Sequence, residues 1–198
     1  MEVFSPLTGT NDVTELDKFD VSKIVSVYQN ELNLDVSRYF QGLDHILLYK
    51  CNATGYRFYF PFFIEADSFF YEQLMLTKKS YYPAWKWENQ MASRFIKETD
   101  KILDVGCGDG AFLSGILKRM NVSAEGLEFN PVAIKKATES GLSVFPETVQ
   151  NYSLVKKQQY DVVTSFQVVE HIVQLKSFLS GKLDLLKPGG VMIIAVPY

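Results

Sequence analysis

The sequence has little of what marks nucleic-acid-binding, membrane or disulfide-rich proteins. Its 20 basic and 23 acidic residues give a net charge of −3, and the basic residues form no cluster that would attract nucleic acid or an anionic membrane. No apolar run approaches the roughly 18 residues of a membrane span, and MEVFSPLTG lacks the basic start and apolar core of a signal peptide. Cys51 and Cys107 lie far apart and cannot build a disulfide framework. These absences favour a cytoplasmic protein that binds neither nucleic acid nor a membrane.

The chain does have enough apolar residues for one domain of ordinary size with an appendage. Of its 198 residues 47% are hydrophobic, which suffices for a packed core. From residue 101 onward, short apolar runs alternate with amphipathic segments, the pattern of a doubly wound, Rossmann-like parallel α/β sheet. Its strands are expected at 102–105, 124–128, 142–145, 160–166 and 191–196. A helix over 173–186 should turn an apolar stripe inward, made of Leu175, Phe178, Leu179, Leu183 and Leu186.

Residues 1–98 follow another pattern, which predicts a separate region of helices with one β-hairpin. Residues 1–20 are polar and interrupted by proline and glycine, so we expect a loose arm there. A first helix is expected over 21–32, with Ser22 as its cap. The spacing also predicts a hairpin of 45–51 and 56–63 around a turn at 52–55, and helices over 67–75 and 84–96.

The segment 101–113, KILDVGCGDGAFL, carries the clearest signal in the chain. The apolar run over 102–105 has the character of a parallel strand that is buried on both faces. Gly106, Gly108 and Gly110 then stop the strand and let the backbone turn beneath a ligand without any Cβ in the way. The segment therefore predicts a strand, a tight turn and a helix that together bind a nucleotide-like cofactor.

Charge distinguishes between two such cofactors. The pattern Gly-x-Gly-x-x-Ala at 106–111 satisfies the loose dinucleotide fingerprint, in which a pyrophosphate lies at the helix N-terminus. However, Asp104 precedes the loop, Asp109 lies within it, and residues 102–117 contain no Lys or Arg. Carboxylates repel a pyrophosphate and suit the ammonium and sulfonium groups of S-adenosylmethionine, which has no phosphate. We therefore expect S-adenosylmethionine as the cofactor.

An acid followed by Gly-x-Gly-x-Gly resembles the first motif of the class I S-adenosylmethionine-dependent methyltransferases, matched here by Asp104, Gly106, Gly108 and Gly110. The resemblance covers about the second half of the chain and is to the bacterial, small-molecule type. It implies a cofactor-binding domain over 99–198 and methyl transfer to a small-molecule acceptor by in-line displacement. The alternatives are a non-catalytic scaffold of the same fold and an NAD(P)-dependent oxidoreductase.

The resemblance gives roles to residues that follow the second and third strands. Glu128 lies 22 positions after the first glycine of the loop, close to the spacing at which an acid accepts both ribose hydroxyls. Phe129 either covers one face of the adenine or packs in the core, and Asn130 is assigned to the same cofactor contact. Glu147 and Thr148 stand where the family places polar contacts to the adenine edge, with a merely solvated loop as the alternative.

The loop after the fourth strand supplies the candidate catalytic residue. Its sequence SFQVVEH is similar to the Glu-His signature of small-molecule members of the family. Because ligands of open α/β sheets bind at the carboxyl ends of strands, Gln167, Val168 and His171 are expected beside the reacting methyl group. His171 is the candidate base for a hydroxyl or an acidic carbon, and its alternative role is to anchor the loop.

Aromatic and sulfur-containing side chains complete the predicted site. Tyr81 and Tyr82 are expected to contact the cofactor as part of a lid supplied by residues 1–98, together with Trp85 and Trp87. Core packing is the alternative for the two tryptophans. Cys107, between two glycines that face the ligand, is expected to be a small neighbour of the cofactor and not a nucleophile.

No metal is expected in this protein. The 45–63 hairpin resembles a Cys-x-x-Cys-Gly knuckle found in some bacterial small-molecule methyltransferases, with Thr54 in place of the second cysteine. One thiol, Cys51, without a nearby histidine is too few ligands for zinc.

The strand over 191–196 is the last that the sequence offers. Related sheets continue with two more strands, so the fold is expected to be truncated after its fifth strand. An interior strand left as an edge exposes unpaired N–H and C=O groups beside an apolar run without charge. We therefore expect a longer protein, or an edge covered by another segment or by a second copy through self-association.

Overall fold

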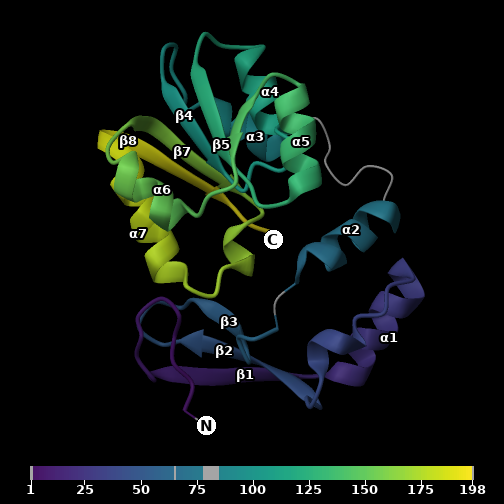
Figure 1. Ribbon diagram of the computed structural model, residues 1–198. Helices are drawn as coiled ribbons and strands as arrows, with labels where there is room; N and C mark the ends of the chain where they lie inside the picture. The colour runs from purple at the N-terminus through teal and green to yellow at the C-terminus, as the bar shows by residue number, and fades with distance from the viewer. Residues whose placement is uncertain (1, 65, 78–84, 198) are drawn as a thin grey trace. The chain divides into compact units, whose positions relative to one another are not determined.

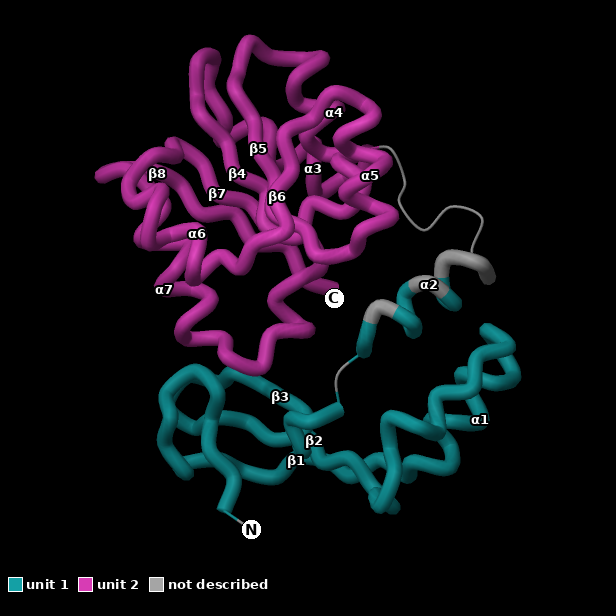
Figure 2. Tube along the Cα trace, in the orientation of Figure 1, with its two compact units in different colours: residues 1–81 teal, residues 82–198 magenta. Residues whose placement is uncertain are grey.

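The computed structural model describes residues 2–64, 66–77 and 85–197. These residues form two compact units, residues 1–81 and residues 82–198 (Figure 2). The sequence pattern put the boundary at residue 98. The units divide earlier because Ala92, within helix α3 (Trp87–Ser93), and Ile96, just after it, pack in the core of the second unit. None of the helices in the described part of the chain is long and apolar enough to cross a membrane.

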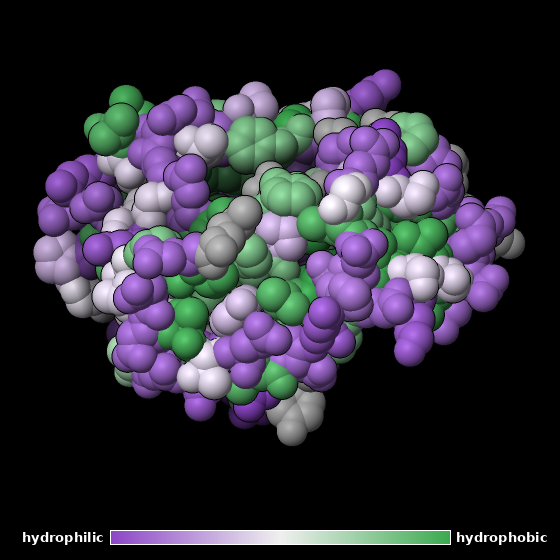
Figure 3. Space-filling view, turned by 90° about the horizontal axis from the view of Figure 1, so that it is seen from below, coloured by the Kyte–Doolittle hydropathy of each residue, from purple (hydrophilic) through white to green (hydrophobic). Residues whose placement is uncertain are grey.

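The first unit combines a three-stranded antiparallel sheet, in the order β1-β2-β3, with helices (Figure 1). Its elements are β1 (Val13–Asp20), α1 (Val21–Leu32), the 3-10 helix η1 (Ser37–Phe40), β2 (His45–Cys51), β3 (Arg57–Phe60) and α2 (Ser68–Thr77). The expected hairpin is confirmed, and it is aromatic on both faces, since Phe58 is buried whereas Tyr59 is 59% exposed. Hydrophobic side chains also reach the surface between hydrophilic ones on the face shown in Figure 3.

Two expectations for the N-terminal residues were wrong. The second half of the expected loose arm is strand β1, which pairs with β2 from Val13↔Cys51 to Asp20↔His45. The polar sequence of β1 does not predict a strand. The strand forms because β2, which is distant in sequence, supplies the hydrogen-bond partners. The cap of α1 is Asp20 and not Ser22, because Asp20 Oδ1 accepts from the N–H of Ser22 over 2.8 Å.

The second unit contains a five-stranded parallel sheet with the order β6-β5-β4-β7-β8. Its strands are β4 (Lys101–Val105), β5 (Ser123–Leu127), β6 (Ser143–Phe145), β7 (Tyr160–Phe166) and β8 (Leu186–Ala195). The helices are α3, α4 (Ala111–Leu117), α5 (Pro131–Glu139), α6 (Val149–Val155), the 3-10 helix η2 (Val169–His171) and α7 (Leu175–Leu185). This arrangement confirms the predicted doubly wound α/β fold.

Two layers of helices cover this sheet, as Figure 1 shows. Side chains of α3, α4 and α5 pack with Ile102 and Val162 on one face. Side chains of α6 and α7 pack with Leu103 and Val163 on the other. Alternate residues of each strand therefore enter two separate cores, which explains the adjacent apolar pairs Ile102 and Leu103 in β4 and Val162 and Val163 in β7.

The strand order changes direction between the central strand β4 and its neighbour β7. After β4 the chain adds β5 and β6 on one side, then returns to add β7 and β8 on the other. In open sheets of this kind, ligands bind in the crevice outside the carboxyl ends of the strands at such a point. The fold therefore predicts that a ligand binds at the loops that follow β4, β5, β6 and β7.

Candidate active site

The glycine loop after β4 is a close-fitting turn with no room for a Cβ at Gly106 or Gly110. Gly106, Gly108 and Gly110 have φ angles of +76°, +57° and +80°, a region in which only glycine is free of strain. A Cβ on Gly106 would lie 2.5 Å from Cγ2 of Val168, which follows β7. The N–H of Gly106 donates to the carbonyl of Leu127 over 2.8 Å and thereby ties the loop to β5. The predicted turn is thus present, and it brings the ends of β4, β5 and β7 together.

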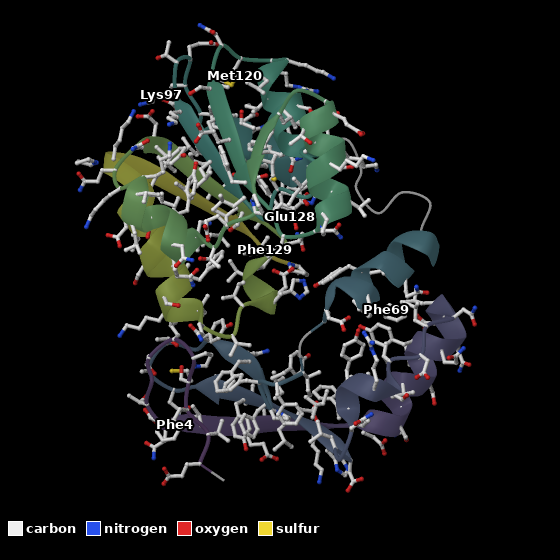
Figure 4. All side chains as sticks on the ribbon, in the orientation of Figure 1. Phe4, Phe69, Lys97, Met120, Glu128 and Phe129 are labelled. Atoms are coloured by element: carbon white, nitrogen blue, oxygen red, sulfur yellow. The ribbon has the colours of Figure 1, made fainter. Side chains whose placement is uncertain are left out.

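Glu128, directly after β5, is held against this loop by backbone amides. Its Oε2 accepts from the N–H of Gly108 over 2.9 Å. Its Oε1 accepts from the N–H groups of Phe129 and Asn130 over 2.7 and 2.8 Å. Figure 4 shows Glu128 and Phe129 at the carboxyl end of β5. Three amide donors fix the orientation of the carboxylate and leave one lone pair, on Oε2, that can accept from a ligand's hydroxyl.

Two further acids give the loop a negative character. Asp104 is buried at the end of β4 and accepts from Thr164 Oγ1 of β7 over 2.7 Å. Asp109 Oδ1 is buried without a hydrogen-bond partner among the described residues, while its Oδ2 lies 3.7 Å from Nζ of Lys136. A buried carboxylate oxygen that lacks a donor, next to a cradle that a Cβ would fill, fits a cationic ligand that can donate hydrogen bonds. The residues present therefore fit S-adenosylmethionine.

A buried lysine that the sequence pattern did not reveal lies near Asp104. Lys182 of α7 is fully buried, and its Nζ donates to Ser165 Oγ of β7 over 2.6 Å. Burial lowers the pKa of Lys182 to about 8, although the charge of Asp104 raises it. Burial likewise raises the pKa of Asp104 to about 7, against the hydrogen bond from Thr164 and the charge of Lys182. The two charges thus partly compensate each other within the core.

The inward stripe predicted for α7 explains why Lys182 was missed. Leu175, Phe178 and Leu185 point inward, but Leu183 is 60% exposed and Lys182 takes the core position. An apolar stripe chosen by residue type assigns the leucine to the core, whereas the helical spacing of Leu175, Phe178 and Leu185 also admits residue 182. The sequence did contain a sign of the buried lysine, because Lys182 lies on the same helical face as Leu175, Phe178 and Leu185.

The loop after β6 is structured by its own hydrogen bonds. Thr148 caps α6, a helix that the sequence did not predict, and its Oγ1 accepts from the N–H of Asn151 over 3.1 Å. Oε1 of Glu147 accepts from Thr148 N–H over 2.9 Å and from Asn151 Nδ2 over 3.1 Å. Asn130 has a similar role at α5, where its Oδ1 accepts from the N–H of Val132 over 2.9 Å. Capping therefore accounts for Thr148 and Asn130 as local structure, whatever else they contact.

The loop after β7 lies directly beside the glycine loop. Gln167 has a φ of +56°, and its N–H donates to the carbonyl of Ala195 in β8 over 2.8 Å. The next residue, Val168, packs over Gly106. His171 ends the short helix η2, with its side chain 55% exposed and its Nε2 3.8 Å from Oε1 of Glu170. This loop therefore presents an imidazole near the ends of the central strands.

Phe129 and Cys107 have opposite environments. Phe129 is 61% exposed, so its alternative role as a core residue is wrong. Cys107 is buried, and a Cβ on Gly126 would come within 2.4 Å of its sulfur. Burial raises the pKa of the Cys107 thiol well above its usual value, as do the nearby carboxylates. A thiol that stays protonated and faces the core is no nucleophile.

The aromatic residues of the proposed lid have different fates. Tyr81 and Tyr82 lie outside the described residues. Trp85 packs on Phe112 with 6.1 Å between ring centroids, and the guanidinium of Arg119 lies 4.0 Å from its ring. Trp87 is 76% exposed, so core packing is wrong for that residue. Within the described residues, no three side chains of His, Cys, Asp or Glu lie together as metal ligands would.

The arrangement can hold a nucleoside with its ribose at Glu128 and a positively charged group near the acids of the loop. A half-exposed imidazole and an exposed aromatic ring stand at the same sheet edge. These residue types can bind and orient a ligand, exclude water and accept a proton.

Comparison with known proteins points in the same direction. Residues 80–198 match a family model described as a methyltransferase domain. The ubiquinone biosynthesis O-methyltransferase of Salmonella enteritidis PT4 is 40% identical over 96 residues, which cover 46% of this chain and 39% of that protein. The same enzyme of Salmonella newport matches to the same extent. The match thus spans about two fifths of the length of these curated relatives.

Two solved structures share the fold. A methyltransferase of Methanococcus maripaludis, described as S-adenosyl-L-methionine-dependent, has a TM-score of 0.53 and 18% identity, covering 65% of this chain and 63% of its own. A structure of Haloferax volcanii, a complex of the Trm112 methyltransferase activator with a methyltransferase, gives a TM-score of 0.51 and 23% identity, covering 57% and 53%. At such identities the likeness shows the fold alone.

Proposed function

The chain belongs to the class I S-adenosylmethionine-dependent methyltransferases, and from this premise we propose that it binds S-adenosylmethionine at the carboxyl ends of β4 to β7 and methylates a small molecule. The observation that carries the proposal is the Glu128 carboxylate, fixed by three backbone amides beside a glycine loop that has no room for a Cβ. Such a carboxylate can accept a ribose hydroxyl at Oε2, and the acids of the loop suit a cationic cofactor.

Different residues would contact different parts of the cofactor. Gly106, Cys107, Gly108 and Gly110 would line it with backbone, and Glu128 would hold the ribose. Phe129, Asn130, Glu147 and Thr148 would surround the adenine, with the exposed ring of Phe129 covering one face. Gln167 and Val168 would lie on the side of the reacting group.

In the chemical step the main role of the protein is to align the acceptor with the methyl group. S-adenosylmethionine supplies an activated methyl group when bound. The protein holds the acceptor in line and excludes water, effects that contribute up to about 7–11 kcal/mol in favourable systems. His171 would take the proton from an acceptor hydroxyl, which is supported by its exposed position after β7.

We propose an oxygen of a small molecule as the acceptor. The support is that the curated relatives are named as O-methyltransferases of ubiquinone biosynthesis and are 40% identical over the shared 96 residues. No basic cluster in the sequence favours nucleic acid instead.

Calorimetric titration tests the cofactor directly. The chain should bind S-adenosylmethionine and S-adenosylhomocysteine with one site each and should not bind NADH. Binding of NADH alone would overturn the proposal in favour of an oxidoreductase. Binding of S-adenosylmethionine without transfer of a labelled methyl group to any catechol or phenol of a test panel would favour a non-catalytic scaffold.

The outer edge of β8 supports a further proposal, self-association with a second copy. Among the described strands β8 pairs with β7 alone, and Val191 and Ile194 are 37% and 40% exposed. Unpaired backbone next to apolar side chains is a template for edge pairing. Sedimentation should show a concentration-dependent dimer that Ile194→Lys removes, whereas Leu183→Lys on the exposed side of α7 leaves it intact. A monomer at all concentrations would contradict this proposal.

A further inference from the structure

Two five-residue turns in the first unit share a sequence pattern and a backbone geometry. Residues 5–9 read Ser-Pro-Leu-Thr-Gly and residues 51–55 read Cys-Asn-Ala-Thr-Gly. In each turn the N–H of the glycine donates to the carbonyl of the first residue over 2.8 Å. Gly9 and Gly55 have φ angles of +72° and +75°. The two turns are therefore structural copies of each other, although only one contains a cysteine.

The sheet brings the two turns together at one end. Cys51, which begins the second turn, ends β2 opposite Val13 of β1. The N–H of Asn52 donates to the carbonyl of Asp12 over 3.0 Å. Figure 1 shows the N-terminal loop, in purple, beside the turn between β2 and β3, and Phe4 is labelled in this loop in Figure 4. The first residue of each turn is buried, since Ser5 is 1% exposed and Cys51 is 0% exposed.

The side chains at the first and fourth positions of both turns meet at the sulfur of Cys51. Thr8 Oγ1 lies 3.6 Å from Cys51 Sγ. The hydroxyls of Ser5 and Thr54 also hydrogen-bond to this sulfur, and together these bonds lower the pKa of the Cys51 thiol.

In each turn, backbone N–H groups of the turn donate to the side-chain atom of its first residue. Ser5 Oγ accepts from the N–H groups of Leu7 and Thr8 over 3.4 and 3.3 Å, and Cys51 Sγ accepts from the N–H of Thr54. Each turn thus cradles one side-chain atom with its own backbone.

Four cysteines commonly hold a structural zinc ion from two adjoining turns, each of which supplies two ligands separated by two residues. Positions 5 and 8 in one turn and 51 and 54 in the other have this spacing. We propose that positions 5, 8, 51 and 54 are the corners of a zinc-type tetrahedral centre in which hydrogen bonds around one sulfur take the place of the metal ion. The two turns supply the backbone of such a centre, and three of the four thiolates are replaced by hydroxyls.

The wild-type centre holds its turns without metal. A zinc site needs deprotonated or strongly basic ligands, and hydroxyls of Ser and Thr stay neutral. The described residues also contain no group of three or more His, Cys, Asp or Glu that could bind an ion. Thiols at positions 5, 8 and 54 would complete the ligand set around Cys51. This inference concerns the first unit and is independent of methyl transfer.

The test is to introduce the three missing thiols in the full chain and titrate it with Co²⁺ under reducing conditions. The variant Ser5→Cys/Thr8→Cys/Thr54→Cys should take up one Co²⁺ per chain with the visible absorption of tetrahedral cobalt–thiolate, which Zn²⁺ then displaces. Zinc should raise its melting temperature, because it binds the folded form. Adding Cys51→Ala to this variant should abolish the four-thiolate spectrum. The wild type should bind neither ion and should melt at the same temperature with and without a chelator.

Two results would overturn the proposal. One is a folded triple variant, by circular dichroism, that gives no tetrahedral cobalt spectrum. The other is a wild type that holds zinc and loses stability when the zinc is chelated.

A second variant decides the matter where the triple variant does not fold. Thr8→Cys alone should form a disulfide with Cys51 under mild oxidation, because Thr8 Oγ1 is 3.6 Å from the sulfur. Thr14→Cys, on the exposed surface of β1, should not form that disulfide. Absence of the Cys51 disulfide in Thr8→Cys would show that the two turns do not converge and would overturn the proposal.

Discussion

The N–H of Gly108 donates to Oε2 of Glu128 over 2.9 Å, so the middle glycine of the loop after β4 is tied to the residue that ends β5. Because the other carboxylate oxygen accepts from Phe129 and Asn130, the side chain is oriented before any ligand arrives. A ligand hydroxyl therefore meets an acceptor that needs no further ordering.

Glu128→Gln should weaken S-adenosylmethionine binding about 10-fold or more. Hydrogen bonds to a charged group contribute about 1.5–3 kcal/mol, and the amide nitrogen of glutamine would face the N–H of Gly108 as a second donor. Calorimetry gives the affinity, and the melting temperature checks the fold. Glu139→Gln, on the exposed surface of α5, is the matched control and should bind normally. Equal affinity in both variants would leave Glu128 as an anchor of the loop only.

His171→Gln should lower kcat for a hydroxyl acceptor by about 10²–10⁴-fold, the usual contribution of a general base, and leave the Kd of S-adenosylmethionine within a few-fold. Glu170→Gln tests whether the carboxylate 3.8 Å away assists the imidazole. If His171→Gln weakens cofactor binding as much as turnover, the residue anchors the loop instead.

The sheet could be predicted from the sequence because its central strands contain short apolar runs, Ile102 and Leu103 in β4 and Val162 and Val163 in β7. Leu103 and Ile102 enter two different cores, so neither position tolerates a polar residue. β1 could not be predicted, since its sequence VTELDKFD is polar and it becomes a strand only through pairing with β2. The local sequence pattern predicts strands and helices whose own apolar side chains face the core. It misses a polar strand that forms only because a segment distant in sequence supplies its hydrogen-bond partners.

The candidate site divides in a similar way. The spacing of the glycines predicted the loop, and the fold brings Glu128 and Val168 to it from separate strands. Lys182 and Ser165 could not be found, because their pairing depends on how α7 packs over β7. The two turns that meet at Cys51 were hidden for the same reason, since a match between residues 5–9 and 51–55 is weak until the sheet joins them.

Gly106→Ala should reduce S-adenosylmethionine affinity at least 10-fold, because its new Cβ would lie 2.5 Å from Val168 Cγ2 and displace that loop. Gly141→Ala is the matched control: its φ of +82° causes the same backbone strain, about 1–2 kcal/mol, but nothing lies within 4 Å of its Cβ. Both variants should lose a few degrees of melting temperature, and only the first should lose binding.

Adding Val168→Ala to Gly106→Ala should restore part of the affinity by making room for the Cβ. Equal binding by Gly106→Ala and Gly141→Ala, measured by calorimetry, would mean that the approach of Val168 to the loop has no part in the site.

The buried Lys182 should make stability depend on pH in a defined window. Its pKa falls from 10.5 in the unfolded chain to about 8 in the core, chiefly through burial. Between these values the unfolded chain binds more protons than the folded chain, so the free energy of unfolding rises with pH there. Below about pH 8 both states carry the charge, and the folded state bears its full desolvation cost.

Lys182→Met keeps the length of the side chain and removes the titrating group, so this variant should lack that rise. Relative to the variant, the wild type should gain about 3 kcal/mol in free energy of unfolding between pH 8 and pH 10.5, since each pKa unit corresponds to about 1.4 kcal/mol. Urea unfolding at pH 7.5, 9 and 10.5 measures the difference, and Lys135→Met, on the exposed face of α5, should show none. The hydrogen bond to Ser165 offsets part of the cost, so Ser165→Ala should lower the pKa of Lys182 further and start the rise in the free energy of unfolding at a lower pH. A constant difference between wild type and Lys182→Met at all three pH values would show that the ammonium is solvated and that α7 does not bury it.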